Sequence, residues 1–176
     1  MTELLLARHG ETDWNRDGRY QGHADPPLNE LGRRQAVELA DSLDGEPLDA
    51  ICSSDLRRSL ETAEIVGERL GLAVERDADL REIDVGSWQG LTRAEIAERS
   101  LDGTWDGETY EQHRGRVVAA VRRIAARHPV GRVLVVTHGG CLRRLQEAAF
   151  GRPEPVVGNC VVCRIAVEDG AIRRID

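Results

Sequence analysis

Short continuous runs of apolar residues alternate along this chain with longer segments in which apolar residues recur three or four positions apart. The continuous runs are typical of buried β-strands, and the recurring pattern is typical of helices that bury one face. The strands predicted in this way cover residues 4–7, 48–52, 72–74 and 133–136. The predicted helices cover residues 29–43, 55–70, 92–97, 109–127 and 139–150.

Local signals mark the ends of the first two helices. Asn29 has the side chain to cap the first helix, and Gly71 is suited to end the second in a left-handed conformation. The spacing also predicts which residues face the core. On the first helix the apolar residues expected on the buried face are Leu31, Ala36, Val37, Leu39 and Ala40.

The order of these elements predicts the fold class. Residues 161–167 and 171–175 resemble strands on either side of Asp169-Gly170, which is a hairpin turn sequence. Strands that alternate with helices indicate an α/β fold, a three-layer α/β/α sandwich with a mainly parallel sheet. The closing hairpin adds one antiparallel edge strand. Because no repeat or Pro/Gly/Ser-rich linker divides the chain, we expect residues 1–176 to form a single domain.

Composition narrows the possible functions. The chain has 24 basic and 31 acidic residues and a formal net charge of −7, which disfavours general binding to nucleic acid or to anionic membranes. All 24 basic residues are arginine. The absence of lysine excludes Schiff-base chemistry and the phosphate-binding lysines of P-loop enzymes and kinases.

The four cysteines show neither a disulfide framework nor metal-ligand spacing. Cys160 and Cys163 form a C-x-x-C pair, but residues three apart on a strand point to opposite faces of the sheet. We therefore expect Cys52, Cys141, Cys160 and Cys163 to be structural. The first residues lack a signal-peptide pattern and the apolar runs are too short to span a bilayer, so we expect a cytoplasmic protein.

The residues suited to catalysis follow three of the predicted strands. The ends of parallel strands meet at one edge of a sheet, where ligands bind, and helix starts near Asp55 and Gly139 would add N–H donors. Clustered arginines and histidines there favour an anion, either a phosphate or a carboxylate. The three junctions are Arg8-His9-Gly10-Glu11-Thr12, Ser53-Ser54-Asp55-Leu56-Arg57-Arg58 and Thr137-His138-Gly139-Gly140.

These junctions and further sequence blocks, which follow one another in the order found in the family, resemble the histidine phosphatase superfamily. The resemblance is strongest to its phosphoglycerate-mutase-like branch. The resemblance covers nearly the whole chain. The blocks that carry it are Arg8-His9-Gly10-Glu11-Thr12 with Trp14-Asn15, Tyr20-Gln21-Gly22, Ser53-Ser54-Asp55-Leu56-x-Arg58, Leu80-x-Glu82-x-Asp84-x-Gly86-x-Trp88-x-Gly90 and Thr137-His138-Gly139-Gly140.

The resemblance implies a role for each matched residue. His9 is similar to the nucleophile that becomes phosphohistidine, and Glu82 to the acid that protonates the leaving alcohol and then activates water. The residues similar to the phosphate clamp are Arg8, Arg58 and His138. The residues similar to supporting contacts around the phosphoryl group and substrate are Thr12, Asn15, Gln21, Gly22 and Gly139.

Other interpretations of individual residues stay open. Arg57 is the alternative to Arg58 for the phosphate clamp, but it is more typical of an exposed helix residue. Arg143-Arg144 is expected on an exposed helix face, where one of the two could border the substrate mouth. The acidic rivals of Glu82, expected to be mostly solvated loop charges, are Glu75, Asp77, Asp79 and Asp84. The histidines outside any motif, expected at the surface or in packing, are His23, His113 and His128.

No cofactor or metal is expected, because metal-ligand spacing is absent and the neighbouring arginines would repel a cation. The stretch between Gly90 and Gly107 is short compared with the insertion that covers the site in mutases of the family. The sequence therefore favours a phosphatase for a small phosphorylated metabolite, such as a sugar phosphate, phosphoglycerate or α-ribazole phosphate. A phosphoglycerate-type mutase is the alternative, and an inactive phosphate-binding module is a remote one. The protein is expected to be a monomer or a homodimer.

Overall fold

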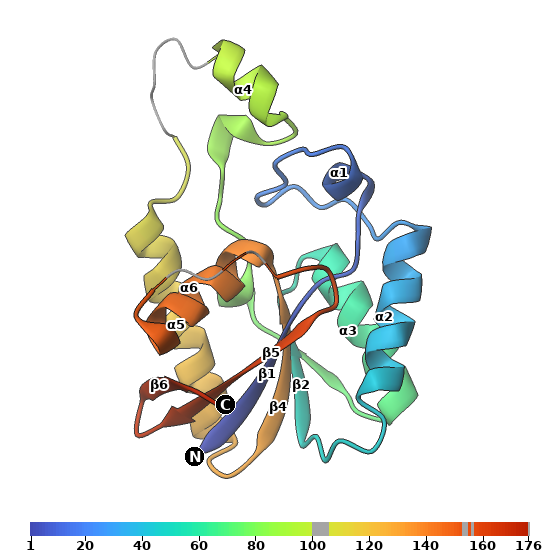
Figure 1. The fold of residues 1–176 in the computed structure, drawn as a ribbon, viewed down its shortest axis with the longest axis vertical. Coiled ribbons are helices and arrows are strands. Elements are labelled where there is room, and N and C mark those ends of the chain that lie inside the picture. The colour runs from blue at the N-terminus through green and yellow to red at the C-terminus, as the bar shows by residue number, and fades with distance from the viewer. Residues whose placement is uncertain (100–105, 153–154, 156, 176) are drawn as a thin grey trace.

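The computed structural model describes residues 1–99, 106–152, 155 and 157–175. Its centre is a six-stranded sheet with the strand order β3-β2-β4-β1-β5-β6 (Figure 1). The predicted strands are all present, with ends that differ by one or two residues. The strands are β1 (Thr2–Arg8), β2 (Ala50–Ser53), β3 (Val74–Arg76), β4 (Arg132–Thr137), β5 (Val162–Glu168) and β6 (Ala171–Arg174).

The sheet is mainly parallel, as predicted. β4 lies between β1 and β2 and is parallel to both, with Arg8 paired to Thr137 and Ser53 paired to Val136 at their carboxyl ends. β5 is antiparallel to β1, and β6 turns back beside β5 to form the edge. The three strands that end in the motif residues are therefore neighbours, and their ends lie at one edge of the sheet.

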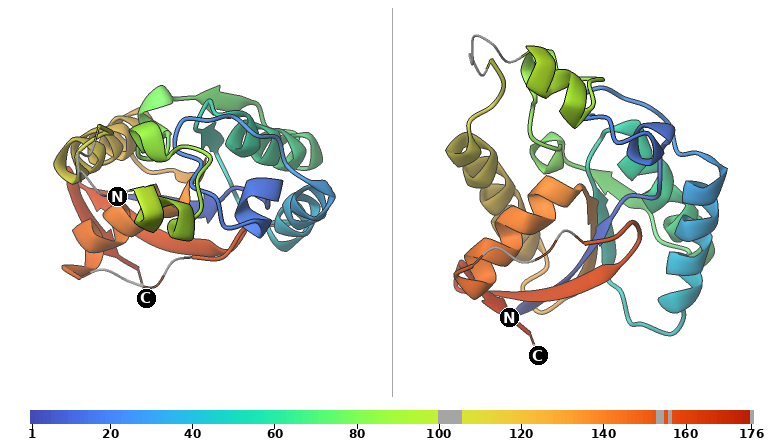
Figure 2. Two further views of the ribbon diagram at one scale, coloured as in Figure 1. Left: turned by 90° about the horizontal axis from the view of Figure 1, so that it is seen from above. Right: turned by 45° about the horizontal axis from the view of Figure 1, so that its top comes forward.

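Helices cover both faces of the sheet, which gives the predicted three layers (Figure 2). One face packs on α2 and α3, and the other on α5 and α6. α1 and α4 lie beyond the carboxyl edge, at the top of Figure 1. The helices are α1 (Asp13–Arg16), α2 (Glu30–Ser42), α3 (Arg57–Leu70), α4 (Arg93–Arg99), α5 (Tyr110–Arg127) and α6 (Gly139–Phe150).

The central strand β1 shows how the two cores share the sheet. Leu4 and Leu6 face the core under α5 and α6, whereas Leu5 and Ala7 face the core under α2 and α3. All four side chains are fully buried. A strand buried on both faces is apolar at every position, which is why it appeared as a continuous run rather than an alternating one.

The predicted helix and turn signals are confirmed. Asn29 Oδ1 accepts from Gly32 N at 2.8 Å, and Gly71 ends α3 at a φ of 70°. Thr109 caps α5 in a reciprocal pair with Gln112. The β5–β6 hairpin turns at Asp169-Gly170, where both residues have positive φ.

Some sequence-based expectations were wrong in detail. Leu31 and Val37 are 41% and 49% exposed, because α2 packs through Gly32, Ala36, Leu39 and Ala40. α3 begins at Arg57, two residues later than predicted. The short helix α1 was not predicted, since four residues are too few to show an apolar period.

All four cysteines are free, with Cys52 and Cys141 buried and Cys160 and Cys163 partly buried. Cys160 has a φ of 56° and precedes β5, so it is not part of that strand. It nevertheless packs under α2 and α3, while Cys163 packs under α5 and α6. No helix in the described part of the chain is long and apolar enough to cross a membrane. The short stretch after Gly90 lies partly outside the described residues, because residues 100–105 are not described.

Candidate active site

His9 lies at the carboxyl end of β1, in the centre of the sheet edge. Its backbone N donates to Thr137 O at 2.9 Å, and its carbonyl accepts from Asn159 Nδ2 at 2.7 Å. The ring atom Nδ1 of His9 lies 2.7 Å from the carbonyl oxygen of Gly10. A carbonyl oxygen only accepts, so Nδ1 carries the proton and Nε2 keeps its lone pair. Burial, Arg58 and Arg8 hold the pKa of His9 well below its ordinary value, so the ring is neutral.

Arg58 lies beside this ring, in the first turn of α3. Its Nε donates to His9 Nε2 at 3.3 Å, and its two terminal nitrogens donate to Ala24 O at 2.7 Å and Gly22 O at 2.9 Å. The side chain is fully buried, and burial lowers its pKa to about 10. Arg58 therefore stays charged at neutral pH, at a fixed position next to the nucleophilic nitrogen.

His138 forms the other side of the pocket, at the end of β4. Its ring centroid is 5.2 Å from that of His9. Its Nε2 is 2.9 Å from Ser54 Oγ, and its Nδ1 is buried without a hydrogen-bond partner. Burial is the main reason why the pKa of His138 lies well below its ordinary value, and the charge of Arg58 lowers this pKa further. The site thus has a second neutral imidazole, and one of its ring nitrogens lacks a hydrogen-bond partner.

Arg8 completes the positive side of the site. Its Nη1 donates to Val157 O at 3.4 Å, while its buried Nε has no hydrogen-bond partner. Burial lowers the pKa of Arg8, and the nearby charge of Glu82 opposes that shift. Buried cations with open donors favour an anion, because it restores both the charge balance and the missing hydrogen bonds.

Glu82 lies opposite this group, on the loop between β3 and α4. Its carboxylate accepts from Gly140 N at 2.9 Å through Oε2 and from Ile83 N at 2.9 Å through Oε1. A side chain at Gly140 would overlap Glu82 Oε1, so the glycine allows this close approach. The first turn of α6 therefore fixes the carboxylate through a backbone N–H.

Arg116 and Glu108 on the α5 side secure the loop that carries Glu82. Arg116 donates to the carbonyl oxygens of Asp79, Arg81 and Glu82 at 3.0, 2.6 and 2.7 Å. Glu108 accepts from Arg116 Nε at 2.6 Å and Nη2 at 2.7 Å. Sequence reasoning missed this pair. No sequence motif marks it, because Arg116 lies eight residues after Glu108 and its other contacts are with a loop distant in the chain.

The five predicted supporting residues make separate contacts beside the site. Thr12 caps α1 by accepting from Asn15 N, and its Oγ1 donates to Gln21 Oε1 at 3.0 Å. Gly22 has a φ of 51° and presents its carbonyl to Arg58. Gly139 begins α6 and lines a cavity next to Glu82. The structure thus brings these five residues to the same edge of the sheet as His9.

The structure separates the rival residues. Arg57 is exposed, whereas Arg58 is fully buried. Asp77 and Asp79 pair with Arg123, and Glu75 pairs with Arg127. Asp84 accepts from Gly86 N within its own loop. None of these four carboxylates lines the cavity that contains Glu82.

Two of the unassigned histidines lie closer to the site than expected. His113 is buried, with Nε2 3.3 Å from Cys141 Sγ and 3.9 Å from Glu82 Oε1. Burial lowers its pKa to about 4, so it is neutral. His23 Nε2 donates to the Glu82 carbonyl at 2.9 Å. His128 ends α5, where its Nε2 lies 4.0 Å from Glu75 Oε1. No sequence motif marks His23 or His113, because their partners are distant in the chain.

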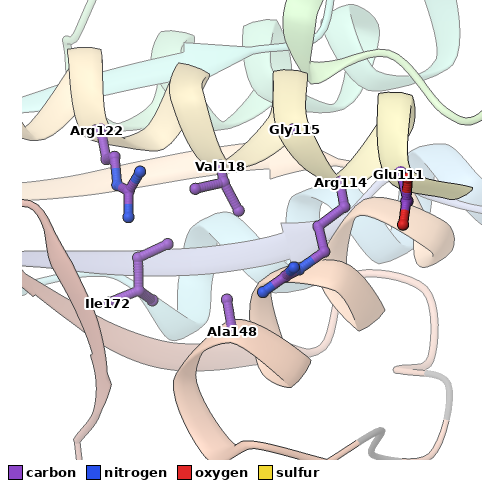
Figure 3. A pocket seen from close by; sticks show the side chains of 7 residues that line it. All are labelled: Glu111, Arg114, Gly115, Val118, Arg122, Ala148 and Ile172. Atoms are coloured by element: carbon purple, nitrogen blue, oxygen red, sulfur yellow. The ribbon is translucent and has the colours of Figure 1, made fainter.

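A cavity of about 240 Å³ opens next to Glu82. Its lining residues are Arg8, Glu82, Ile83, Tyr110, His113, Gly139, Gly140, Arg143 and Arg144. A larger hollow of about 470 Å³ lies between α5, α6 and β6, with Arg114, Val118 and Arg122 facing Ala148 and Ile172 (Figure 3). It contains no histidine and none of the motif residues, so the small cavity is the one related to the catalytic candidates.

One group in the described chain has metal-ligating atoms close together. These are Glu82, His113 and Cys141, with ligand atoms within 4.8 Å of one another. The Cys141 thiol is fully buried, and burial raises its pKa. A thiol must lose its proton to bind a metal, and Arg116 already lies near Glu82 and Cys141. This group is therefore a poor fit for a cation.

An α/β sandwich with two neutral histidines and two arginines at the carboxyl edge of its sheet defines an anion-binding enzyme suited to phosphoryl transfer. The chain belongs to the histidine phosphatase superfamily, branch 1, whose family model matches residues 4–174.

Several known proteins are similar over most of the chain. Phosphoglycerate mutase-like protein 4 of Arabidopsis thaliana is 38% identical over 84% of this chain and 70% of its own. A metal-independent phosphoserine phosphatase of the same plant is 40% identical over 82% of this chain and 67% of its own length. The solved structure of Bacillus stearothermophilus YhfR has a TM-score of 0.91 and 36% identity, covering 98% of this chain and 94% of its own. The chain is a phosphatase of this family that acts on small phosphorylated metabolites.

Proposed function

We propose that this protein hydrolyses small phosphate monoesters through a phosphohistidine intermediate on His9. The observation that carries the proposal is the state of the His9 ring. It is neutral, its Nδ1 is occupied by the Gly10 carbonyl, and its Nε2 lies 3.3 Å from the guanidinium of Arg58. A neutral imidazole nitrogen beside a fixed positive charge is suited to attack an anionic phosphoryl group.

In the first step, His9 Nε2 forms a bond to phosphorus while the bond from phosphorus to the ester oxygen breaks. Glu82 gives a proton to the departing oxygen, so the product leaves as a neutral alcohol. Arg8, Arg58 and His138 surround the phosphoryl oxygens and stabilise their negative charge. The buried Arg8 Nε and His138 Nδ1, which have no other hydrogen-bond partner, are suited to bind those oxygens.

In the second step, water attacks the phosphohistidine. The Glu82 carboxylate takes a proton from this water, the N–P bond breaks, and inorganic phosphate leaves with His9 again neutral. Gly140 N and the Arg116 clamp keep Glu82 in place for both steps. Thr12, Asn15, Gln21, Gly22 and Gly139 support the phosphoryl pocket, Gly22 by fixing Arg58 and Gly139 by beginning α6.

The decisive experiment is to trap the intermediate. The protein is mixed with a ³²P-labelled aryl phosphate, quenched in base within milliseconds and digested. We expect label on the peptide that contains His9, stable to base and lost in acid. The His9→Ala variant should carry no label, and the matched variant His128→Gln, at the far end of α5, should label normally. Full turnover without label on His9 would refute the proposal.

A phosphoglycerate-type mutase remains the second candidate, since one similar protein carries that name. A mutase returns the phosphoryl group to a bound alcohol, whereas a phosphatase passes it to water. The two are separated by supplying 3-phosphoglycerate and following both 2-phosphoglycerate and inorganic phosphate. We expect phosphate to be the main product, and 2-phosphoglycerate as the main product would establish the mutase.

The proposal also covers metal dependence, location, domain organisation and assembly. Hydrolysis should need no metal, so excess chelator should leave turnover unchanged. One similar protein is itself named a metal-independent phosphatase. Four free cysteines fit a reducing compartment, which supports a cytoplasmic location. One continuous sheet supports a single domain over residues 1–176, as a monomer or a homodimer.

A further inference from the structure

Residues 21–24 form a turn whose backbone holds the arginine beside the nucleophile. Gly22 O and Ala24 O accept from the two terminal nitrogens of Arg58 at 2.9 and 2.7 Å. Arg58 Nε in turn donates to His9 Nε2 at 3.3 Å. The turn therefore fixes the positive charge next to the nitrogen that attacks phosphorus.

The same turn also makes two hydrogen bonds to the loop that carries Glu82. The Ala24 backbone N donates to Gln89 Oε1 at 2.7 Å. His23 Nε2 lies 2.9 Å from the Glu82 carbonyl oxygen, and because a carbonyl only accepts, Nε2 carries the proton and donates. Of these two bonds, the one from His23 is made to the candidate proton donor itself.

The Glu82 carbonyl oxygen accepts a second hydrogen bond, from Arg116 Nη2 at 2.7 Å. Arg116 belongs to α5 and His23 to the turn that binds Arg58, so two segments distant in the chain hold one oxygen. Arg116 also binds the carbonyl of Arg81, so it would keep the loop in place without His23. Loss of His23 should therefore shift Glu82 relative to Arg58 without releasing the loop.

We propose that His23 is a positioning residue for proton transfer, because its hydrogen bond sets the proton donor Glu82 relative to the phosphate-binding Arg58. This inference rests on the proposed function, since it takes Glu82 as the proton donor. A proton donor must lie within hydrogen-bond distance of the leaving oxygen, and a small displacement lowers the rate. The turn binds Arg58 through backbone carbonyls, so the side chain of His23 can be replaced without removing those contacts.

The test compares two amide side chains of different reach at this position. In His23→Gln the amide nitrogen lies about as far along the side chain as Nε2, whereas in His23→Asn it lies about as far as Nδ1 and falls short. We expect His23→Asn to lower kcat on alkyl phosphates by about tenfold, the effect of one hydrogen bond, with KM unchanged. Aryl phosphates, whose leaving groups need no proton, should react at nearly the wild-type rate. His23→Gln should recover most of the loss.

Two further variants separate positioning from general damage to the turn. In the Glu82→Gln background, His23→Asn should cause no additional loss on alkyl phosphates, because the proton donor is already gone. The matched control is Gln89→Ala, which removes the other hydrogen bond between the turn and this loop. Ala24 N keeps its bond to Gln21 O at 2.9 Å, so this control should leave the ratio of alkyl to aryl rates at its wild-type value.

Several outcomes would overturn the inference. These are equal kinetics in His23→Asn and His23→Gln, an equal loss on alkyl and aryl phosphates, the same selective loss in Gln89→Ala, or additive losses from His23→Asn and Glu82→Gln. The proposed function fails separately, since it requires label on His9 from an aryl phosphate, a step that does not depend on His23.

Discussion

Arg116 donates to the backbone oxygen of Glu82 at 2.7 Å, so the position of the candidate proton donor is set by a residue of another element. The same guanidinium also binds the carbonyls of Asp79 and Arg81 and both oxygens of Glu108. The short 3-10 helix Ala78–Leu80 and the residues after it are thereby fixed at three carbonyls within four residues. The placement of Glu82 depends on this clamp as much as on its own side-chain contacts.

Replacing Arg116 should therefore impair catalysis without removing a reacting group. In Arg116→Gln we expect a fall in kcat of about 100-fold on alkyl phosphates, because a displacement of Glu82 by about 1 Å spoils proton transfer. Aryl phosphates, whose leaving groups need no proton, should lose much less. Steady-state kinetics on both substrate classes checks this.

The same substitution should lower stability, because Glu108 and three carbonyls each lose a charged hydrogen-bond donor. We expect a loss of about 3 kcal/mol in the free energy of unfolding, measured in urea. Arg122→Gln, further along α5 with one hydrogen bond to Gly170 O, should cost much less. Equal kinetic losses on alkyl and aryl phosphates would show that Arg116 acts otherwise than through Glu82.

Removing the proton from Glu82 gives the direct test of its role. Glu82→Gln keeps the shape of the side chain and should slow hydrolysis of alkyl phosphates by about 100-fold to 10,000-fold. Formation of phosphohistidine from aryl phosphates, followed in a burst experiment, should be nearly normal. Its breakdown should be slow, because water then lacks a base. A uniform loss in both phases would count against Glu82 as acid and base.

Gly140 should tolerate no side chain. In Gly140→Ala the new methyl group would overlap Glu82 Oε1, and the carboxylate would have to move. The expected result is a kinetic defect similar to that of Glu82→Gln, larger on alkyl than on aryl phosphates. Gly115→Ala is the matched control, since Gly115 lies in α5 with no atom within 4 Å of the added carbon. That control should keep full activity and gain up to about 1 kcal/mol of stability.

Buried neutral histidines should make the protein sensitive to acid. The pKa of His113 is about 4 in the folded protein and about 6.5 when unfolded. Between these values the unfolded chain binds the extra proton, so stability rises with pH across this window and is lost as the pH falls from 6.5 to 4. The full contribution of His113 is about 3 kcal/mol.

His113→Gln removes this titration while keeping a polar side chain. Urea unfolding at pH 7 and pH 4 should show a stability loss that is smaller in the variant by about 3 kcal/mol. His9 and His138, whose pKa values are also held low by burial, should still give the variant some acid sensitivity. An identical pH dependence in the variant and the wild type would mean that His113 is accessible to protons in the folded state.

Local sequence determined the elements and the motif residues. β1 and β4 were predicted because strands buried on both faces must be apolar at every position. Asn29 and Gly71 marked helix ends through their own side-chain and backbone properties. His9 directly follows the end of β1, and Arg58 is the second residue of α3, so their position at the sheet edge could also be predicted.

Only the tertiary structure decided what surrounds those residues. The neutral state of His9, the clamp of Arg116 on the Glu82 loop and the burial of His113 arise from contacts between segments distant in the chain. Arg143 and Arg144 are adjacent in the chain but differ in their hydrogen-bond partners. This difference could not be predicted either, because it depends on where Tyr110 and Glu147 lie. Charge, burial and hydrogen bonding depend on neighbours in space, and a linear pattern records only neighbours along the chain.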